Sequence, residues 1–362
     1  MNKCRSILLF AVALLSLCGC LNFSDKTEPK IRRVFCWGMI KDEASAARYA
    51  AAGVTDIRVR SKQELAWVQK YGMTAYCNTI TPAGPHPQVL SPEEEKYHNY
   101  INGLDLPKST PKADRKKIIN QRRREKGHRF GGDRLNSIDT LNVNSLPCFG
   151  CDTDFTFTGK KIDSILAKTV SGVQGIYMDY FGYVNHRGCY CKGCLKRCQE
   201  FLNNRKLADT PENRDLFYQE QLIAYFNRAV DYVKARRPDF KIVAHIYPEF
   251  EPNPLYGYLT KADYCGETVS WYFQWSPEKI AKYTTAVVNR KQLVPGCAGV
   301  PFIGVSTNSR GSLGYKSPAD VEKELQIILR SGGDSLMVCN GDSMIAPGYF
   351  EVFQKYCSRQ SH

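Results

Sequence analysis

The sequence lacks the short motifs that mark several enzyme classes. Its 362 residues contain no G-x-S-x-G nucleophile elbow, no H-E-x-x-H metal motif and no Walker phosphate loop. No glycine-rich phosphate loop follows the first expected strand either, which disfavours a dinucleotide-binding open sheet. These absences exclude the usual serine hydrolases, zinc proteases and P-loop nucleotidases.

Long apolar runs are equally scarce. Residues 7–17 form one such run, which is too short to anchor stably across a bilayer, and no second one follows. The mean hydropathy of −0.39 agrees with a soluble body, and the 43% hydrophobic content is enough to build a large core.

The apolar run is preceded by Lys3 and Arg5 and ends at Leu17-Cys18-Gly19-Cys20, which is similar to a lipobox. We therefore expect residues 1–19 to be a lipoprotein signal peptide, Cys20 to carry the lipid and residues 20–30 to be a polar tether. The alternative is a plain signal peptide that is cleaved nearby. The lipid would attach the protein to a bacterial membrane, in the periplasm or at the cell surface.

No nucleic-acid-binding module is recognisable, although the formal net charge is +14. The basic residues concentrate between positions 108 and 134. They fit a solvated insertion or, alternatively, attraction to an acidic partner such as a uronic or sulfated glycan. Nucleic acid is therefore not an expected partner.

Short apolar runs alternate with helical patterns from residue 31 onward, which predicts a parallel sheet with crossover helices. Strands are expected at residues 33–39, 56–60, 74–79, 175–179, 242–246, within 262–271, and at 302–306 and 335–339. Helices are expected at 42–51, 63–71, 160–170, 191–203, 212–236, 277–289, 318–330 and 347–356. Eight such units predict one (β/α)8 TIM barrel over residues 31–362, with a long basic insertion after strand 3, at about 82–146.

The fifteen cysteines include two closely spaced groups. Cys189, Cys191 and Cys194 form a C-x-C-x2-C pattern, and Cys148 and Cys151 form a C-x2-C pattern upstream. Such spacings suit tetrahedral thiolate ligation of zinc, whereas disulfides between cysteines this close are strained. A structural zinc site at the barrel rim is one interpretation, and disulfides between the two groups are the other.

The segment Gly175-Ile176-Tyr177-Met178-Asp179 followed by this cysteine loop resembles strand 4 and its zinc loop in the β-galactosidases of glycoside hydrolase family 42. The resemblance covers about 30 residues. It implies a barrel that carries structural zinc on Cys189, Cys191, Cys194 and Cys148 or Cys151. It also implies a carbohydrate substrate.

The catalytic glutamates of that family have no counterpart here. Tyr180 and Phe181 stand where its acid/base glutamate follows strand 4, and residues 302–309 contain no glutamate that could be its nucleophile. Asp179, at the end of strand 4, is therefore the leading catalytic candidate, because barrel active sites lie at the carboxyl ends of the strands.

Glycoside hydrolysis usually needs a second carboxyl group. Glu249, Glu267 and Asp342 follow strands 5, 6 and 8, and the first two are the preferred candidates. Other side chains near strand ends are expected to bind substrate: Trp37, Arg58, Tyr180, His245, Trp271 and Asn340. The sequence thus predicts an exported glycoside hydrolase with Asp179 at its centre, or a barrel without catalysis that binds carbohydrate or has a structural role.

Overall fold

A computed structural model describes residues 30–77, 99–100, 103–125, 149–150, 152–181, 192–246, 255–270, 275–293, 300–307 and 316–357, together with residues 92 and 96. Ile31–His362 forms one compact unit. No helix in the described part of the chain has the length and apolar character that a membrane crossing needs.

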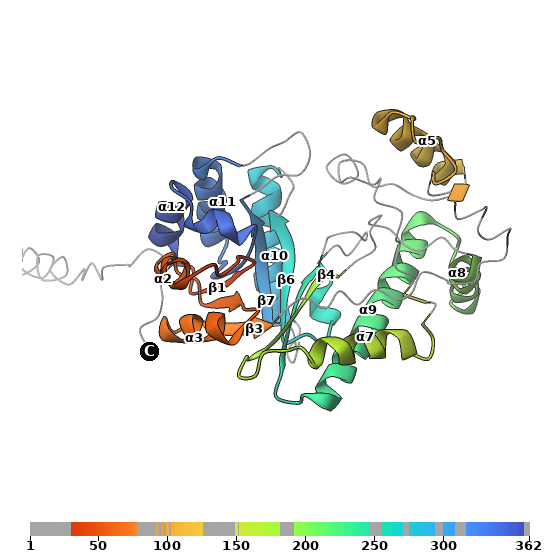
Figure 1. Ribbon diagram of the computed structural model, residues 1–362. Coiled ribbons are helices and arrows are strands. Elements are labelled where there is room, and N and C mark those ends of the chain that lie inside the picture. The colour runs from red at the N-terminus through yellow and green to blue at the C-terminus, as the bar shows by residue number, and fades with distance from the viewer. Residues whose placement is uncertain are drawn as a thin grey trace, which may run out of the picture. The chain divides into compact units, whose positions relative to one another are not determined.

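Eight parallel strands pair in sequence order and close into a barrel (Figure 1). They are β1 (Arg33–Cys36), β2 (Asp56–Arg58), β3 (Thr74–Cys77), β4 (Gly175–Phe181), β5 (Lys241–Ile246), β6 (Tyr264–Ser270), β7 (Val300–Ser306) and β8 (Ser335–Cys339). The barrel closes where β1 pairs with β8, with Phe35 opposite Met337. The predicted (β/α)8 barrel is confirmed.

The described helices follow or precede these strands as crossovers require. They are α2 (Glu43–Ala51), α3 (Lys62–Lys70), α5 (Lys112–Glu125), α7 (Thr156–Leu166), α8 (Lys192–Asn204), α9 (Pro211–Arg236), α10 (Pro277–Leu293), α11 (Pro318–Arg330) and α12 (Tyr349–Tyr356), with short 3-10 turns η3 (Gly257–Leu259) and η5 (Gly341–Ile345). The basic insertion between β3 and β4 contains α5.

Side-chain caps fix where several of these helices begin. Asp42 and Ser317 form capping boxes with the third residues of α2 and α11, and Ser61 and Thr210 cap α3 and α9. Each cap satisfies an amide that the first helical turn leaves unbonded. Past the end of α11, Gly332 adopts a left-handed backbone that glycine favours.

Helix α7 begins four residues before its predicted start, at Thr156 instead of residue 160. The Asp152 carboxylate accepts hydrogen bonds from the amides of Phe157 and Thr158, and Asp154 accepts from Thr156. These two aspartates stabilise a helix start that the apolar pattern alone does not reveal.

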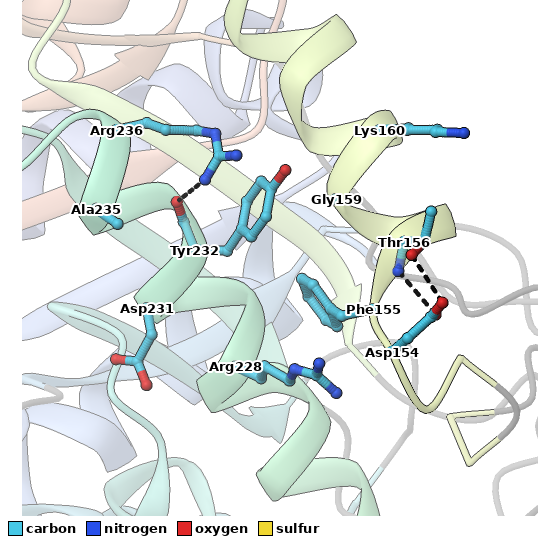
Figure 2. Close-up of a pocket in the computed structure, with 10 residues that line it drawn as sticks. All are labelled: Asp154, Phe155, Thr156, Gly159, Lys160, Arg228, Asp231, Tyr232, Ala235 and Arg236. Atoms are coloured by element: carbon cyan, nitrogen blue, oxygen red, sulfur yellow. Dashed lines mark hydrogen bonds between the residues drawn. The ribbon is translucent and has the colours of Figure 1, made fainter.

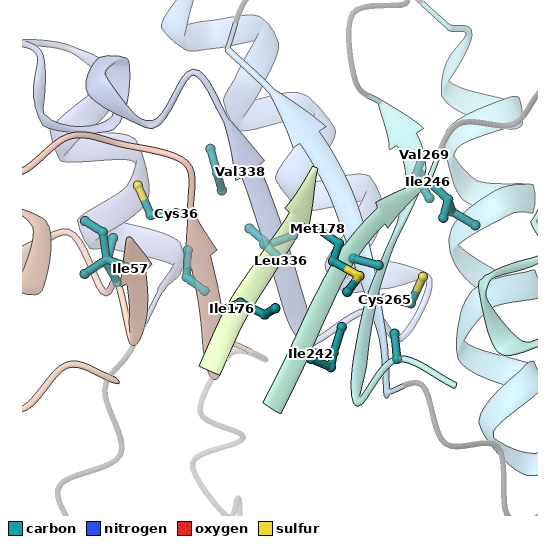
Figure 3. Close-up of a cluster of buried hydrophobic side chains, with 14 of the residues drawn as sticks. Cys36, Ile57, Ile176, Met178, Ile242, Ile246, Cys265, Val269, Leu336 and Val338 are labelled. Carbon is teal, nitrogen blue, oxygen red and sulfur yellow. The ribbon is translucent and has the colours of Figure 1, made fainter. Parts of the chain in front are cut away.

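Strand residues divide between two packed regions. One face of β1 to β6 and of β8 packs toward the helices, in a large apolar cluster that Figure 3 shows in part. Its strand members include Val34, Cys36, Ile57, Ile176, Met178, Ile242, Ala244, Ile246, Cys265, Val269, Leu336 and Val338. The opposite face points into the barrel, where a second cluster consists of Phe35, Tyr76, Tyr177, Val243 and Met337, flanked by Trp37 and Tyr264. Because side chains alternate along a strand, a residue next to a member of one cluster points to the opposite face of the strand.

The amino-terminal end of the barrel interior holds an ion pair. Arg33 donates to both carboxylate oxygens of Asp56, at 3.0 and 2.9 Å, and Thr55 Oγ1 donates to the same carboxylate. The Arg33 guanidinium also lies over the rings of Phe35 and Tyr264, 5.0 and 4.3 Å from their centroids. Burial alone would lower the pKa of Arg33, but the bonds and charge of Asp56 outweigh it and raise that pKa.

Candidate functional site

The carboxyl ends of the eight parallel strands meet at one rim of the barrel, which is where barrel enzymes bind their substrates. Trp37 follows β1 by one residue and Arg58 ends β2. Trp37 shares the inner face with Phe35, and Arg58 shares it with Asp56, since the intervening Cys36 and Ile57 pack toward the helices. The rim therefore receives both predicted substrate-binding side chains.

Trp37 packs against Tyr177 of β4, with ring centroids 4.6 Å apart and an interplanar angle of 36°. The indole Nε1 of Trp37 and the hydroxyl of Tyr177 are both buried and bond to no other described residue. Burial raises the pKa of Tyr177 well above its ordinary value, so the hydroxyl stays protonated and can donate. Two buried donors that have no partner among the described residues can bond a polar ligand or water there.

Arg58 is half-buried, and no described acidic side chain lies within ion-pair distance of it. Its charge acts on Tyr177, because it opposes the effect of burial on the pKa of that phenol. A half-buried guanidinium at the rim offers five donors in a planar fork. Arg58 is thus the main described cation on the inner face of this end.

His245 lies on the inner face of β5, two residues after Val243, and is fully buried. Burial lowers its pKa to about 3, so the imidazole is neutral at physiological pH. A neutral ring can donate from one nitrogen and accept at the other, which suits contact with hydroxyl groups.

Asn340 follows β8 with φ 55° and ψ 47°, the left-handed region that asparagine tolerates better than most residues. Its side chain is partly exposed, and its carbonyl accepts a bond from Thr307 Oγ1 at 3.4 Å. The left-handed residue turns the chain directly from β8 into η5 at the rim.

Asp179 and Tyr180 lie in the last part of β4, but their side chains lie outside the described residues. The pairing of β4 with β5 changes register between Met178 and Phe181, so the irregularity falls on these two residues. Such bulges re-aim side chains and are frequent beside active sites. Glu249 and Trp271 lie entirely outside the described residues.

Glu267 lies on the outer face of β6, together with Cys265 and Val269, and is 2% exposed. Its Oε1 accepts the amide of Gly257 at 2.7 Å, and a side chain at Gly257 would collide with Cys265 and Glu267. The carboxylate therefore fastens η3 to the barrel wall and faces away from the interior. This position does not suit the catalytic role that the sequence predicted for it.

The carboxylate of Asp342 also accepts hydrogen bonds from within the fold. Its Oδ1 accepts from the backbone amide of Met39 and from the hydroxyl of Tyr49, each at 2.9 Å. It therefore fixes the loop between β1 and α2 against η5.

A buried network that sequence reasoning missed ties β6 to α11. Lys316 Nζ donates to the carbonyl and hydroxyl of Ser270 and to Glu324, at 2.6, 2.9 and 3.0 Å. Burial lowers the pKa of Lys316, although the charge of Glu324 opposes this, and burial raises the pKa of Glu324. No spacing pattern could have revealed it, because Ser270 lies 46 residues from Lys316.

Of the predicted zinc ligands, only Cys194 is described; Cys148, Cys151, Cys189 and Cys191 lie outside the described residues. Cys194 is buried near the start of α8, and its sulfur accepts a bond from Arg197 Nη2 at 3.0 Å. A side chain at Gly150 would overlap the same guanidinium. Gly150 therefore lies against the side chain that contacts Cys194.

A hollow of about 580 Å³ lies between α7 and α9, away from the strand ends (Figure 2). Arg228 lies over Phe155 and donates to the Thr153 carbonyl, and Arg236 lies over Tyr232 and pairs with Asp163. Its arginines already have partners, so it is a weaker candidate for ligand binding than the rim.

Comparison with known proteins supports the fold alone. No protein-family model matches the sequence, and no curated protein matches it significantly. The glycoside hydrolase domain of PgaB (BpsB) from Bordetella bronchiseptica matches with a TM-score of 0.51 and 10% identity, over 92% of this chain and 99% of that one. A catalytic mutant of Gan42B, a GH42 β-galactosidase from G. stearothermophilus, matches with a TM-score of 0.50 and 12% identity, over 90% of this chain and 56% of that one. This chain shares the TIM-barrel fold of these glycoside hydrolases.

Proposed function

We propose that the protein is a glycoside hydrolase that cleaves a glycan at the carboxyl-terminal rim of its barrel. The observation that carries the proposal is the pair of buried donors on Trp37 and Tyr177 beside the Arg58 cation. An aromatic face with adjacent donors is the usual way to hold a sugar ring, because it matches both the apolar and the hydroxylated parts of the sugar.

Asp179 is the proposed central carboxylate, because it lies near the end of β4, at the register change and two residues after Tyr177. Glu249, three residues past the end of β5, is the proposed second carboxylate, since Glu267 and Asp342 are engaged in structural bonds. A separation of about 5 Å between the two carboxyl groups would favour retention, and about 6.5–9.5 Å would favour inversion.

The first test is Asp179→Asn, assayed against a panel of glycans by release of reducing ends. We expect at least a thousandfold loss of turnover with an unchanged melting temperature, because the amide conserves size but cannot act as nucleophile, acid or base. Glu267→Gln is the matched control: it should keep turnover, since Glu267 faces away from the interior, and the glutamine oxygen can still accept the bond from the Gly257 amide. Full activity in Asp179→Asn would remove the proposed mechanism.

A second candidate is a barrel that binds carbohydrate without cleaving it. It is favoured by the outward position of Glu267, since the described inner-face side chains at the rim include no carboxylate. The same experiment separates the two: glycan binding by the native protein with no cleavage of any bound glycan would establish the binding function.

We further propose that Cys194, Cys189, Cys191 and one of Cys148 and Cys151 hold a structural zinc ion. The contact of Gly150 with the guanidinium that bonds Cys194 supports it. Four thiolates would leave no open position for water, so the metal would brace the rim and take no part in cleavage. Metal analysis should give about one zinc per chain in the native protein and none in Cys194→Ser. The same cysteines found in disulfides would contradict this.

Export and lipidation at Cys20 remain part of the proposed function. In a bacterial host, Cys20→Ser should abolish incorporation of labelled palmitate and release the protein from the membrane fraction, whereas Cys18→Ser should not. Unlabelled native protein would leave the plain signal peptide as the explanation.

A further inference from the structure

We propose that Arg58 makes the rim selective for an acidic glycan, by binding a carboxylate or sulfate group on the sugar that packs beside Trp37. This inference rests on the proposed glycan-binding function and goes beyond it by naming the charge of the substrate.

Arg58 differs from the other described arginine of the inner face in its bonding. Among the described residues, Arg33 and Arg58 lie on the inner faces of neighbouring strands, and the guanidinium of Arg33 is engaged by Asp56 and two aromatic rings. Arg58 is half-buried, yet no described carboxylate lies within ion-pair distance of it. A half-buried cation that pairs with no described carboxylate is suited to binding an anion.

The polar groups around Arg58 also favour an anionic ligand. The described polar groups on the inner face include the Trp37 Nε1, the protonated Tyr177 hydroxyl and the neutral His245, while the Asp56 carboxylate on the same face is already bonded by Arg33. Two of these are donors, and donors together with a guanidinium match an oxyanion better than a neutral hydroxyl or an amine.

The net charge of the whole chain also favours an acidic ligand. The formal net charge of +14 attracts anionic polymers and raises the rate at which they reach the surface. Helix α5 contributes to this charge, with a sequence of KADRKKIINQRRRE. Two of its arginines, Arg115 and Arg122, are bonded to backbone carbonyls, and Arg122 pairs with Asp105, while Lys112 and Lys117 are exposed. This long-range attraction is independent of the rim and would fade with salt, whereas the Arg58 contact would persist.

The test is equilibrium binding by calorimetry, with the Asp179→Asn variant used to prevent cleavage. The probes are oligogalacturonate, alginate and hyaluronan fragments, each paired with its carboxyl-reduced neutral counterpart, and chondroitin sulfate fragments paired with a neutral counterpart that is both carboxyl-reduced and desulfated. We expect at least one acidic fragment to bind about tenfold to a hundredfold tighter than its neutral counterpart, as for a hydrogen bond to a charged group. Arg58→Gln should remove this difference, and Arg58→Lys should restore part of it.

Arg60→Gln is the matched control, because it removes the same charge two residues away. Arg60 is exposed and already bonded to Glu64 and to the Ile40 carbonyl. It should leave the preference for acidic fragments intact. An equal loss in both variants would reduce the effect to net charge and overturn the proposal.

The remaining outcomes separate this inference from the function on which it rests. Equal binding of acidic and neutral members of every pair would overturn the acidic preference but leave glycan binding standing. A parallel loss of affinity for acidic and neutral members in Arg58→Gln would assign Arg58 to positioning and also overturn it. No binding of any glycan, acidic or neutral, would contradict the proposed function itself.

Discussion

The arginines at the two ends of the barrel interior have contrasting surroundings. At the amino-terminal end, Arg33 is bonded by Asp56 and covered by Phe35 and Tyr264. At the carboxyl-terminal end, Arg58 has no acidic partner among the described residues, and the donors of Trp37 and Tyr177 are unbonded there. The ion pair at the amino-terminal end stabilises the closed barrel. The donors at the carboxyl-terminal end remain able to form hydrogen bonds with a ligand. The difference indicates that one end maintains the fold and the other meets a ligand.

Breaking the ion pair at the amino-terminal end should have the largest effect on stability. Asp56→Ala strands a partly buried guanidinium and removes three hydrogen bonds, so we expect the free energy of unfolding to fall by about 3 kcal/mol. Urea denaturation measures this loss.

Asp239→Ala is the matched control for that change, since Arg237 also donates two bonds to Asp239 but on the exposed surface. We expect a much smaller loss there, because solvent screens exposed pairs. Equal losses in the two variants would erase the contrast between interior and surface.

Acidification should destabilise the protein through His245. Its folded pKa of about 3 lies below the ordinary value near 6.5, so the unfolded chain binds a proton that the folded chain does not. Stability attributable to this residue is therefore full above pH 6.5 and is lost as the pH falls from there toward 3, by up to about 1.4 kcal/mol per pH unit.

His245→Gln removes this titration, so the difference in stability between native and variant protein should shrink or reverse as the pH falls from 7.5 to 4.5. Urea denaturation at each pH measures it. If the curves of stability against pH ran parallel for the native and variant proteins, the imidazole would have the same pKa in the folded and unfolded states. That result would contradict the prediction.

Removing the rim cation should cost the least stability. Arg58→Gln loses no ion pair with a described residue, so we expect the free energy of unfolding to change by no more than about 0.5 kcal/mol. Thermal and urea denaturation measure it beside Asp56→Ala. A loss as large as that of Asp56→Ala would show that Arg58 belongs to the framework, and would remove the distinction between the two ends.

Much of this architecture was predictable, because local signals set it. Helix α11 and strand β8 have the predicted bounds, since Ser317 caps the helix and Gly332 follows its end. Trp37 and Arg58 were predicted near the rim because each lies near the end of an expected strand, at 33–39 and 56–60, although the structure ends both strands earlier.

Other features depended on contacts or on register that the sequence does not display. The face of Glu267 could not be inferred, because the boundary of strand 6 was not fixed and a shift of one residue reverses every side chain. The Lys316 network joins residues far apart in the chain, and no periodicity encodes such a pair. The early start of α7 depends on Asp152, whose capping bonds skip several residues.

The capped helices have a consequence for the electric field at the rim. Because α2, α3 and α11 directly follow strands, their amino-terminal ends lie on the side where those strands finish. Each aligned set of peptide dipoles places about half a positive charge at that end. The backbone therefore contributes positive partial charge at each of these helix starts, which Asp42, Glu64 and Asp320 partly offset. An acidic group that reached one of these helix starts would be stabilised by this charge only within about the first helical turn.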